Sequence, residues 1–214
     1  CAYFQGMPDA NWVHREAQRT LKRLLPRLQS AIDATGDTAA FMDRLNAHFE
    51  DAFLYLHLVY GDQYDLIYHL ENTLAILLEH FAARPAALRM LDDERRANTQ
   101  PPLWYQQADM IGAVLYVDLF AGDLAGVRKR IPYLKELDIT YLHLMPLFRA
   151  PQINSDGGYA VSDFRTVNPA LGTMEELADL AAELRANGIS LCLDFVFNHT
   201  SAEQQWALKA RAGD

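Results

Sequence analysis

Two short polar segments of this sequence carry the side chains that could bind or convert a small molecule. Residues 155–159 have the sequence SDGGY and combine a carboxylate, two glycines and a tyrosine. Residues 194–200 have the sequence DFVFNHT, in which an apolar run ends abruptly in Asn198-His199. In α/β proteins, polar side chains at the carboxyl ends of strands are the usual place for small-molecule chemistry. These two segments therefore mark the candidate site.

The candidate site depends on an alternation of strands and helices in the second half of the chain. Apolar runs predict three strands, at Ala113–Leu119, Thr140–Leu144 and Ile189–Phe197. A helical pattern covers Asp123–Glu136, where Pro132 should break or offset the helix.

A second helix follows a long polar loop that extends through Val167. It begins at a capping box of Thr173 and Glu176 and ends at Asn187-Gly188. This order of elements predicts right-handed βαβ units and a parallel sheet. A complete (β/α)8 barrel takes about 250 residues, so this part is either a small open sheet or the first part of a barrel.

The first half, from Pro8 to about Leu91, has a helical pattern throughout. Breaks are predicted at residues 35–37 and 60–62, and Asp92–Pro102 suits an interdomain connection. Apolar residues recur at helical spacing in three stretches: Leu21, Leu24, Leu25 and Leu28; Phe41, Leu45, Phe49 and Phe53; Leu70, Leu74, Leu77, Leu78 and Phe81.

The composition excludes several classes of protein. The 214 residues carry a formal net charge of −9, which argues against nucleic-acid and anionic-membrane partners. No apolar run approaches the roughly 20 residues of a membrane span. Cys1–Gly6 resembles the scar of a cleavable tag, and we interpret residues 1–7 as a tag remnant. Cys192 is then the only native cysteine, interpreted as a buried structural thiol, and the composition favours a reduced, cytoplasmic protein.

The motifs SDGGYAVSDF, VNPALGT and LDFVFNHTS resemble the first barrel segments of the α-amylase superfamily of glycoside hydrolases. The stretch YVDLFAGDLAGVRKRIPYLKELDITYLHLMPLF resembles amylosucrases and sucrose hydrolases, which also place a helical domain before the barrel. The resemblance implies an α + α/β organisation: an all-helical amino-terminal domain with its linker at residues 8–100, then the first three β/α units of a (β/α)8 (TIM) barrel at residues 101–214.

The resemblance also implies a mechanism. Such enzymes cleave sucrose with retention, through a glucosyl intermediate on an aspartate, while a glutamic acid protonates the leaving fructose. Retention needs two carboxyls about 5–5.5 Å apart. The family carries them on barrel strands four and five, so we expect no catalytic residue in this chain and no activity from it alone. Neither a cofactor nor a metal is expected, since the histidines lack metal-like spacing.

The resemblance assigns the glucose-binding side of the pocket to this chain. Asp156 matches an aspartate on the pocket floor that holds a sugar hydroxyl. Tyr159 matches an aromatic platform beneath the glucosyl ring, and His199 matches a histidine that bonds a glucosyl hydroxyl. Asn198 is expected to brace the loops, and Asp194 to support the strand.

Each of these residues also has a plainer interpretation. An Asp-Gly-Gly sequence is most often a turn, Tyr159 could belong to the core, and a strand-end histidine is usually structural. For Asp194 and Asn198 the two interpretations are evenly balanced. His143 is expected to be a hydrogen-bonded residue of the barrel interior, and Asp118, at the end of the first strand, either braces a loop or contacts substrate.

Three functions remain open at this stage. The first is the amino-terminal part of a sucrose-acting enzyme, which transfers glucose to an α-1,4-glucan acceptor as an amylosucrase or to water as a sucrose hydrolase. The second is a trehalose synthase-like isomerase, which the preceding helical domain disfavours. The third is a truncated, non-catalytic sugar-binding or interaction protein.

Overall fold

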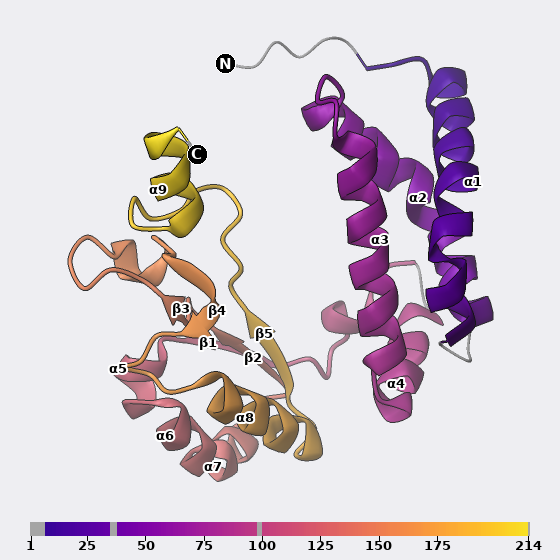
Figure 1. Cartoon of the computed structure of the whole chain (residues 1–214). Helices are drawn as coiled ribbons and strands as arrows, with labels where there is room; N and C mark the ends of the chain where they lie inside the picture. The colour runs from indigo at the N-terminus through magenta and orange to yellow at the C-terminus, as the bar shows by residue number, and fades with distance from the viewer. Residues whose placement is uncertain (1–6, 35–37, 98–99, 214) are drawn as a thin grey trace. The chain divides into compact units, whose positions relative to one another are not determined.

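The computed structural model describes residues 7–34, 38–97 and 100–213 (Figure 1). The chain divides into two compact units, with the boundary in the sequence between Glu94 and Arg95. The interpretation of Cys1–Gly6 as a tag scar and the predicted break at residues 35–37 fall outside the described residues. Each unit has a hydrophobic core of its own.

The first unit is built from helices α1 (Ala10–Ala34), α2 (Thr38–Tyr60) and α3 (Leu66–Ala83), and α4 (Ala86–Ala97) follows them. All three predicted apolar stripes contribute buried residues, but Leu77 is 53% exposed. The neighbouring helices α1 and α2 pack mainly against the row of α3 residues spaced four apart, from Leu66 to Leu78. Leu77 lies outside this row and stays exposed. The predicted connection Asp92–Pro102 is helical in its first part, because α4 extends through Ala97.

The second unit contains the predicted parallel sheet. Its strands are β1 (Gly112–Leu115), β2 (Tyr141–Leu144) and β5 (Ser190–Leu193), in the order β1-β2-β5. Figure 1 shows α6 (Leu124–Lys129) and α8 (Met174–Ala186) on the same side of this sheet. Their apolar faces pack with the buried side chains of β2 in a single core.

Two of the strands are shorter than predicted. The first predicted strand stops at Leu115, and Val117–Ala121 forms the short helix α5, so Asp118 lies on an exposed helical position. Val117 is still buried, because a helix can bury an apolar residue as well as a strand can. The last strand stops at Leu193 rather than Phe197, because its neighbour β2 ends at Leu144; the backbone N–H of Asp194 still donates to the carbonyl of Leu144 at 3.4 Å.

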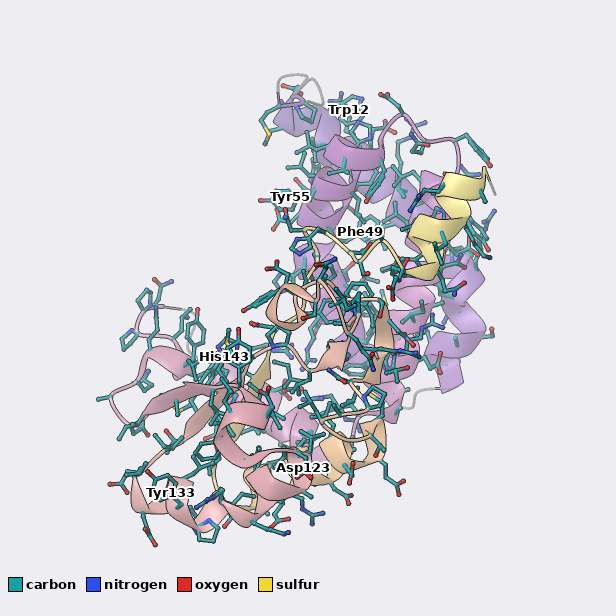
Figure 2. The ribbon with its side chains drawn as sticks, turned by 90° about the vertical axis from the view of Figure 1, so that its left-hand side faces the viewer. Trp12, Phe49, Tyr55, Asp123, Tyr133 and His143 are labelled. Atoms are coloured by element: carbon teal, nitrogen blue, oxygen red, sulfur yellow. The ribbon has the colours of Figure 1, made fainter. Side chains whose placement is uncertain are left out.

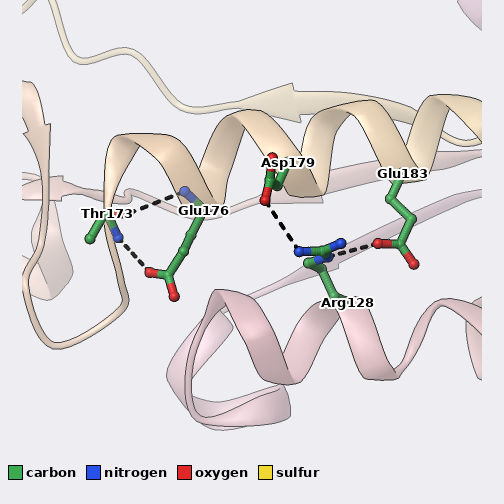
Figure 3. Close-up of polar contacts among 5 residues, drawn as sticks. All are labelled: Arg128, Thr173, Glu176, Asp179 and Glu183. Carbon is green, nitrogen blue, oxygen red and sulfur yellow. Dashed lines mark hydrogen bonds and ion pairs between the residues drawn. The ribbon is translucent and has the colours of Figure 1, made fainter.

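The helices between the strands follow their sequence signals. Pro132 lies in the first turn of α7 (Ile131–Glu136), where it separates α7 from α6 as predicted. The predicted capping box is present: the backbone N–H of Thr173 donates to Glu176 at 2.8 Å, and the N–H of Glu176 donates to the Thr173 hydroxyl at 3.1 Å (Figure 3). Arg128 of α6 pairs with Asp179 and Glu183, and thereby ties α6 to α8 (Figure 3).

The stretch predicted as one long polar loop contains regular structure. Strands β3 (Phe148–Arg149) and β4 (Asp163–Val167) pair in antiparallel fashion, with the single-turn 3₁₀ helix η2 (Asp156–Gly158) between them. Helix α9 (Gln205–Ala212) follows β5 in the sequence. None of the helices in the described ranges has both the length and the hydropathy that a membrane crossing requires.

Candidate functional site

The carboxylate of Asp194 joins the two polar segments. Asp194 directly follows β5, and its Oδ2 accepts a hydrogen bond from the Tyr159 hydroxyl at 2.8 Å. Its Oδ1 lies 2.8 Å from Nε2 of His143, which lies on β2 (Figure 2). One carboxylate therefore fixes both a tyrosine of the SDGGY segment and a histidine of the sheet.

This hydrogen bond raises the pKa of the tyrosine. The bond to Asp194, helped by partial burial and by the negative charge nearby, raises the pKa of Tyr159 to about 12. The shift extends the pH range over which the protonated phenol can donate to Asp194 above the ordinary value of 10.0. Its ring is half-buried and held in one orientation, which a platform for a ligand requires.

Asp156 projects from a tight turn whose backbone demands glycine. Asp156 itself has φ 52°, and Gly157 and Gly158 follow with φ 65° and 94°. A Cβ on Gly158 would lie 3.1 Å from Cβ and 3.3 Å from the carbonyl oxygen of Pro146. The plainer prediction of a turn is thus confirmed, and the turn leaves the Asp156 carboxylate exposed to a ligand.

Asn198 and His199 are exposed and lie in the segment that follows β5. Their side chains are within 3.4 Å of each other, from Nδ2 of Asn198 to Nδ1 of His199. Two residues later, the backbone N–H of Ser201 donates to the carbonyl of Val161 at 2.9 Å. This bond and the Tyr159–Asp194 bond hold the His199 segment and the Asp156 segment side by side.

The structure does not link every predicted site residue directly. In the part of the chain that it describes, no hydrogen bond joins the side chains of Asp156 and His199. No hydrogen bond joins Asp118 of α5 to the network within the described residues, but Asp118 lines a cavity of about 510 Å³ that Gly157 and Gly158 also line. Cys192 is half-buried rather than fully buried, and its contact with Tyr141 raises the pKa of that tyrosine.

Sequence reasoning placed His143 in the barrel interior but did not connect it to the site. The missing signal was strand periodicity. His143 pairs with Cys192 across the sheet, and a residue two positions further along, Asp194, faces the same side as Cys192. An imidazole on one strand is within reach of a carboxylate that directly follows the adjacent strand on the same face. Among the described residues, no group of three or more His, Cys, Asp or Glu side chains could hold a metal ion.

Comparison with known proteins identifies the family. Residues 92–214, more than half of the chain, match the model of the alpha-amylase catalytic domain. The chain belongs to the alpha-amylase family. The match includes both polar segments and all three strands of the parallel sheet, so the second unit is part of an alpha-amylase catalytic domain.

Individual members of the alpha-amylase family resemble this part of the chain. Maltase A2 of Drosophila melanogaster is 44% identical over 89 residues, which are 42% of this chain and 15% of the maltase. Trehalose synthase of Thermus thermophilus is 36% identical over 117 residues, which are 51% of this chain and 12% of the synthase. The chain thus spans less than a fifth of either relative.

A solved structure also matches. The trehalulose synthase MutB from Pseudomonas mesoacidophila is 33% identical, with a TM-score of 0.44, over 49% of this chain and 20% of that protein.

Proposed function

We propose that the protein is a retaining enzyme that takes glucose from sucrose and passes it to an α-1,4-glucan or to water. This chain supplies the glucose-binding side of the pocket. The observation that carries the proposal is the hydrogen bond from Tyr159 to Asp194, because it holds the SDGGY segment against the strand that leads to His199. The likeness of residues 116–148 to amylosucrases and sucrose hydrolases supports sucrose as the donor.

Each residue has a distinct role in this proposal. The exposed carboxylate of Asp156 accepts charge-assisted hydrogen bonds from the glucosyl hydroxyls. The ring of Tyr159 covers the apolar C–H face of the sugar, while its hydroxyl stays bonded to Asp194. His199 hydrogen-bonds a hydroxyl beside the reaction centre. Asn198 braces the loop through its contact with His199, and Asp194 positions Tyr159.

These residues bind and orient the sugar but do not break its bond. Retaining hydrolysis requires a nucleophilic carboxylate and a proton donor about 5–5.5 Å apart. In the proposed function both come from barrel strands four and five. Binding groups of the kind found here raise the rate only where they hold the transition state more tightly than the substrate. Oxygens of Asp156 are suited to this, because a carboxylate bonds more strongly as positive charge develops on the glucosyl ring.

One observation favours a second candidate, a trehalose synthase-like isomerase. The match to the Thermus thermophilus trehalose synthase covers 117 residues, a longer stretch than the 89 residues matched to maltase A2. Both functions use the same glucose-binding groups and differ in the second sugar. Products therefore distinguish them.

The test uses the full-length natural protein, incubated with sucrose, maltose or trehalose, with and without maltoheptaose, followed by product analysis. We expect fructose release from sucrose, with growth of the glucan if the enzyme is a transferase. Asp156→Asn should raise KM for sucrose, whereas Asp62→Asn, an exposed carboxylate of the helical unit, should not. Conversion of maltose to trehalose without turnover of sucrose would replace the proposal with the isomerase.

A further inference from the structure

The Asp194 carboxylate is held from two sides, and the proposed function assigns no role to His143 on one of them. Nε2 of His143 lies 2.8 Å from Oδ1 of Asp194, and the Tyr159 hydroxyl donates to Oδ2 at 2.8 Å. The side chains of His143 and Asp194 are only 28% and 21% exposed, and any further packing would lower these fractions. Water competes little for hydrogen bonds in such a place, so each of them contributes more than it would at the surface.

The carboxylate determines which groups of this network are donors. As an ionised carboxylate, Asp194 can only accept hydrogen bonds. Nε2 of His143 must therefore carry the proton that faces Oδ1, just as the Tyr159 hydroxyl donates to Oδ2. One donor engages each oxygen of the planar carboxylate, and the two donors together select one orientation of the group.

The backbone alone does not fix this orientation. The register between β2 and β5 ends at Leu144 and Leu193, and the backbone N–H of Asp194 reaches the carbonyl of Leu144 only at 3.4 Å. This distance is long for such a hydrogen bond, and the terminal torsion of an aspartate is broad. The carboxylate is therefore oriented by its side-chain partners. His143 is the partner that lies on a strand of the parallel sheet, which is a more precise support than a loop.

The ring of Tyr159 needs such a support at its far end. Tyr159 directly follows Gly157 and Gly158, which have φ 65° and 94°, in a turn of a single 3₁₀ helix. Its hydroxyl also lies 4.0 Å from the sulfur of Met145, but a thioether is a weak acceptor. The bond to Asp194 is thus the strong contact that holds the hydroxyl. A continuous series of contacts runs from the sheet, through His143 and Asp194, to the aromatic ring.

We propose that His143 is a positioning residue for sugar binding: its Nε2–H holds the Asp194 carboxylate in the orientation in which the other oxygen anchors the Tyr159 hydroxyl. The use of the Tyr159 ring as a sugar platform rests on the proposed function, whereas the hydrogen bonds are independent of which sugar binds. In this role His143 acts on the sugar only through Asp194 and Tyr159. Its loss should therefore raise KM and leave kcat nearly unchanged.

The test measures KM and kcat of the full-length protein for sucrose, maltose and trehalose. His143→Leu removes the donor, and we expect KM to rise about tenfold, the lower end of the effect of a hydrogen bond to a charged group. His143→Gln retains an N–H donor the same number of bonds from the backbone and should restore most of the affinity. The matched control is His57→Leu in the helical unit, where His57 packs against Trp12 and Phe53; it should leave KM unchanged.

A double-mutant cycle distinguishes positioning from a general structural effect. In Tyr159→Phe the hydroxyl that His143 acts on is already absent, so the further change His143→Leu should raise KM by less than about twofold. Increases in KM that multiply independently would refute the inference. A fall in kcat without a change of KM in His143→Leu would also refute it, because that result indicates a smaller fraction of folded enzyme.

A third measurement requires neither a variant nor a sugar. The ¹⁵N chemical shifts of the His143 ring in the wild type report which nitrogen carries the proton, and we expect a proton on Nε2. A proton on Nδ1 alone would refute the inference, whatever the substrate is.

The outcomes also separate this inference from the proposed function. If the wild type converts maltose or trehalose but not sucrose, the proposed donor is wrong, and the role of His143 stands when the cycle shows the same coupling for that sugar. If the wild type converts none of the three sugars, the proposed function is refuted, and the role of His143 in sugar binding is refuted with it.

Discussion

Replacement of Asp194 by asparagine tests the centre of the candidate site. The Asp194 carboxylate accepts the Tyr159 proton at 2.8 Å, and this hydrogen bond is the largest contribution to the raised pKa of Tyr159. Asparagine keeps the shape of the side chain but removes the negative charge. We therefore expect the pKa of Tyr159 to fall from about 12 towards its ordinary value of 10.0, while the part that comes from burial remains. Each pKa unit of that decrease lowers the proton affinity of the phenol tenfold.

The structure also predicts a smaller change in the Tyr159 pKa for a control variant, Asp156→Asn. Asp156 acts on Tyr159 only through its charge and makes the smallest of the contributions to the raised pKa. Asp156→Asn should therefore lower the pKa of Tyr159 much less than Asp194→Asn does. Tyrosines labelled with ¹³C at Cζ can be titrated by NMR, and the Tyr159→Phe variant identifies the resonance of Tyr159.

The direction of the pH effect on stability follows from the same shift. The folded state raises the pKa of Tyr159, so the stability gained is complete below pH 10.0 and is lost as pH rises towards about 12. Asp194→Asn should shift the loss to lower pH. The reasoning is refuted if the Tyr159 pKa stays near 12 in Asp194→Asn, or if Asp156→Asn lowers it equally.

Three further predictions address the elements that support the site. Thr173→Ala removes the capping box of α8 and should lower the free energy of unfolding, measured by urea denaturation, by about 0.5–2 kcal/mol. Thr173→Ser keeps the hydroxyl and should retain most of this stability. An equal loss of stability in both variants would contradict the capping role. Gly158→Ala should weaken sugar binding in calorimetry, because φ is 94° and the new Cβ would press on Pro146; unchanged affinity would show that the turn adapts. Thr166→Val should raise the pKa of Asp163 towards its ordinary value, because it removes the hydrogen bond from the Thr166 hydroxyl. The stability that the lowered pKa provides above pH 3.8 should then be lost at a higher pH in the variant than in the wild type during acid titration. An unchanged midpoint of acid unfolding would contradict this.

Much of the local structure was predictable from sequence patterns. The apolar stripes of the first unit, the capping box at Thr173 and the offset at Pro132 depend on residues within one or two helical turns. The three-stranded parallel sheet follows from the order of elements, because short connections through a helix leave few alternatives. Both polar segments were also recognisable, because Asp156, Tyr159 and His199 lie in motifs that a family resemblance makes distinctive.

The lengths of the strands and the connections within the site were decided by tertiary structure. An apolar run is compatible with a buried strand or a buried helix. The run predicted as one strand, Ala113–Leu119, therefore divides into strand β1 and helix α5, which begins at Val117. The end of β5 depends on where its neighbour ends. Asp194 could not be recognised as the shared partner of Tyr159 and His143 from either segment alone, since the three residues meet only when the sheet and the η2 turn are assembled. The sequence gives the type of each side chain, whereas hydrogen bonds between residues far apart in the sequence form only in the folded protein.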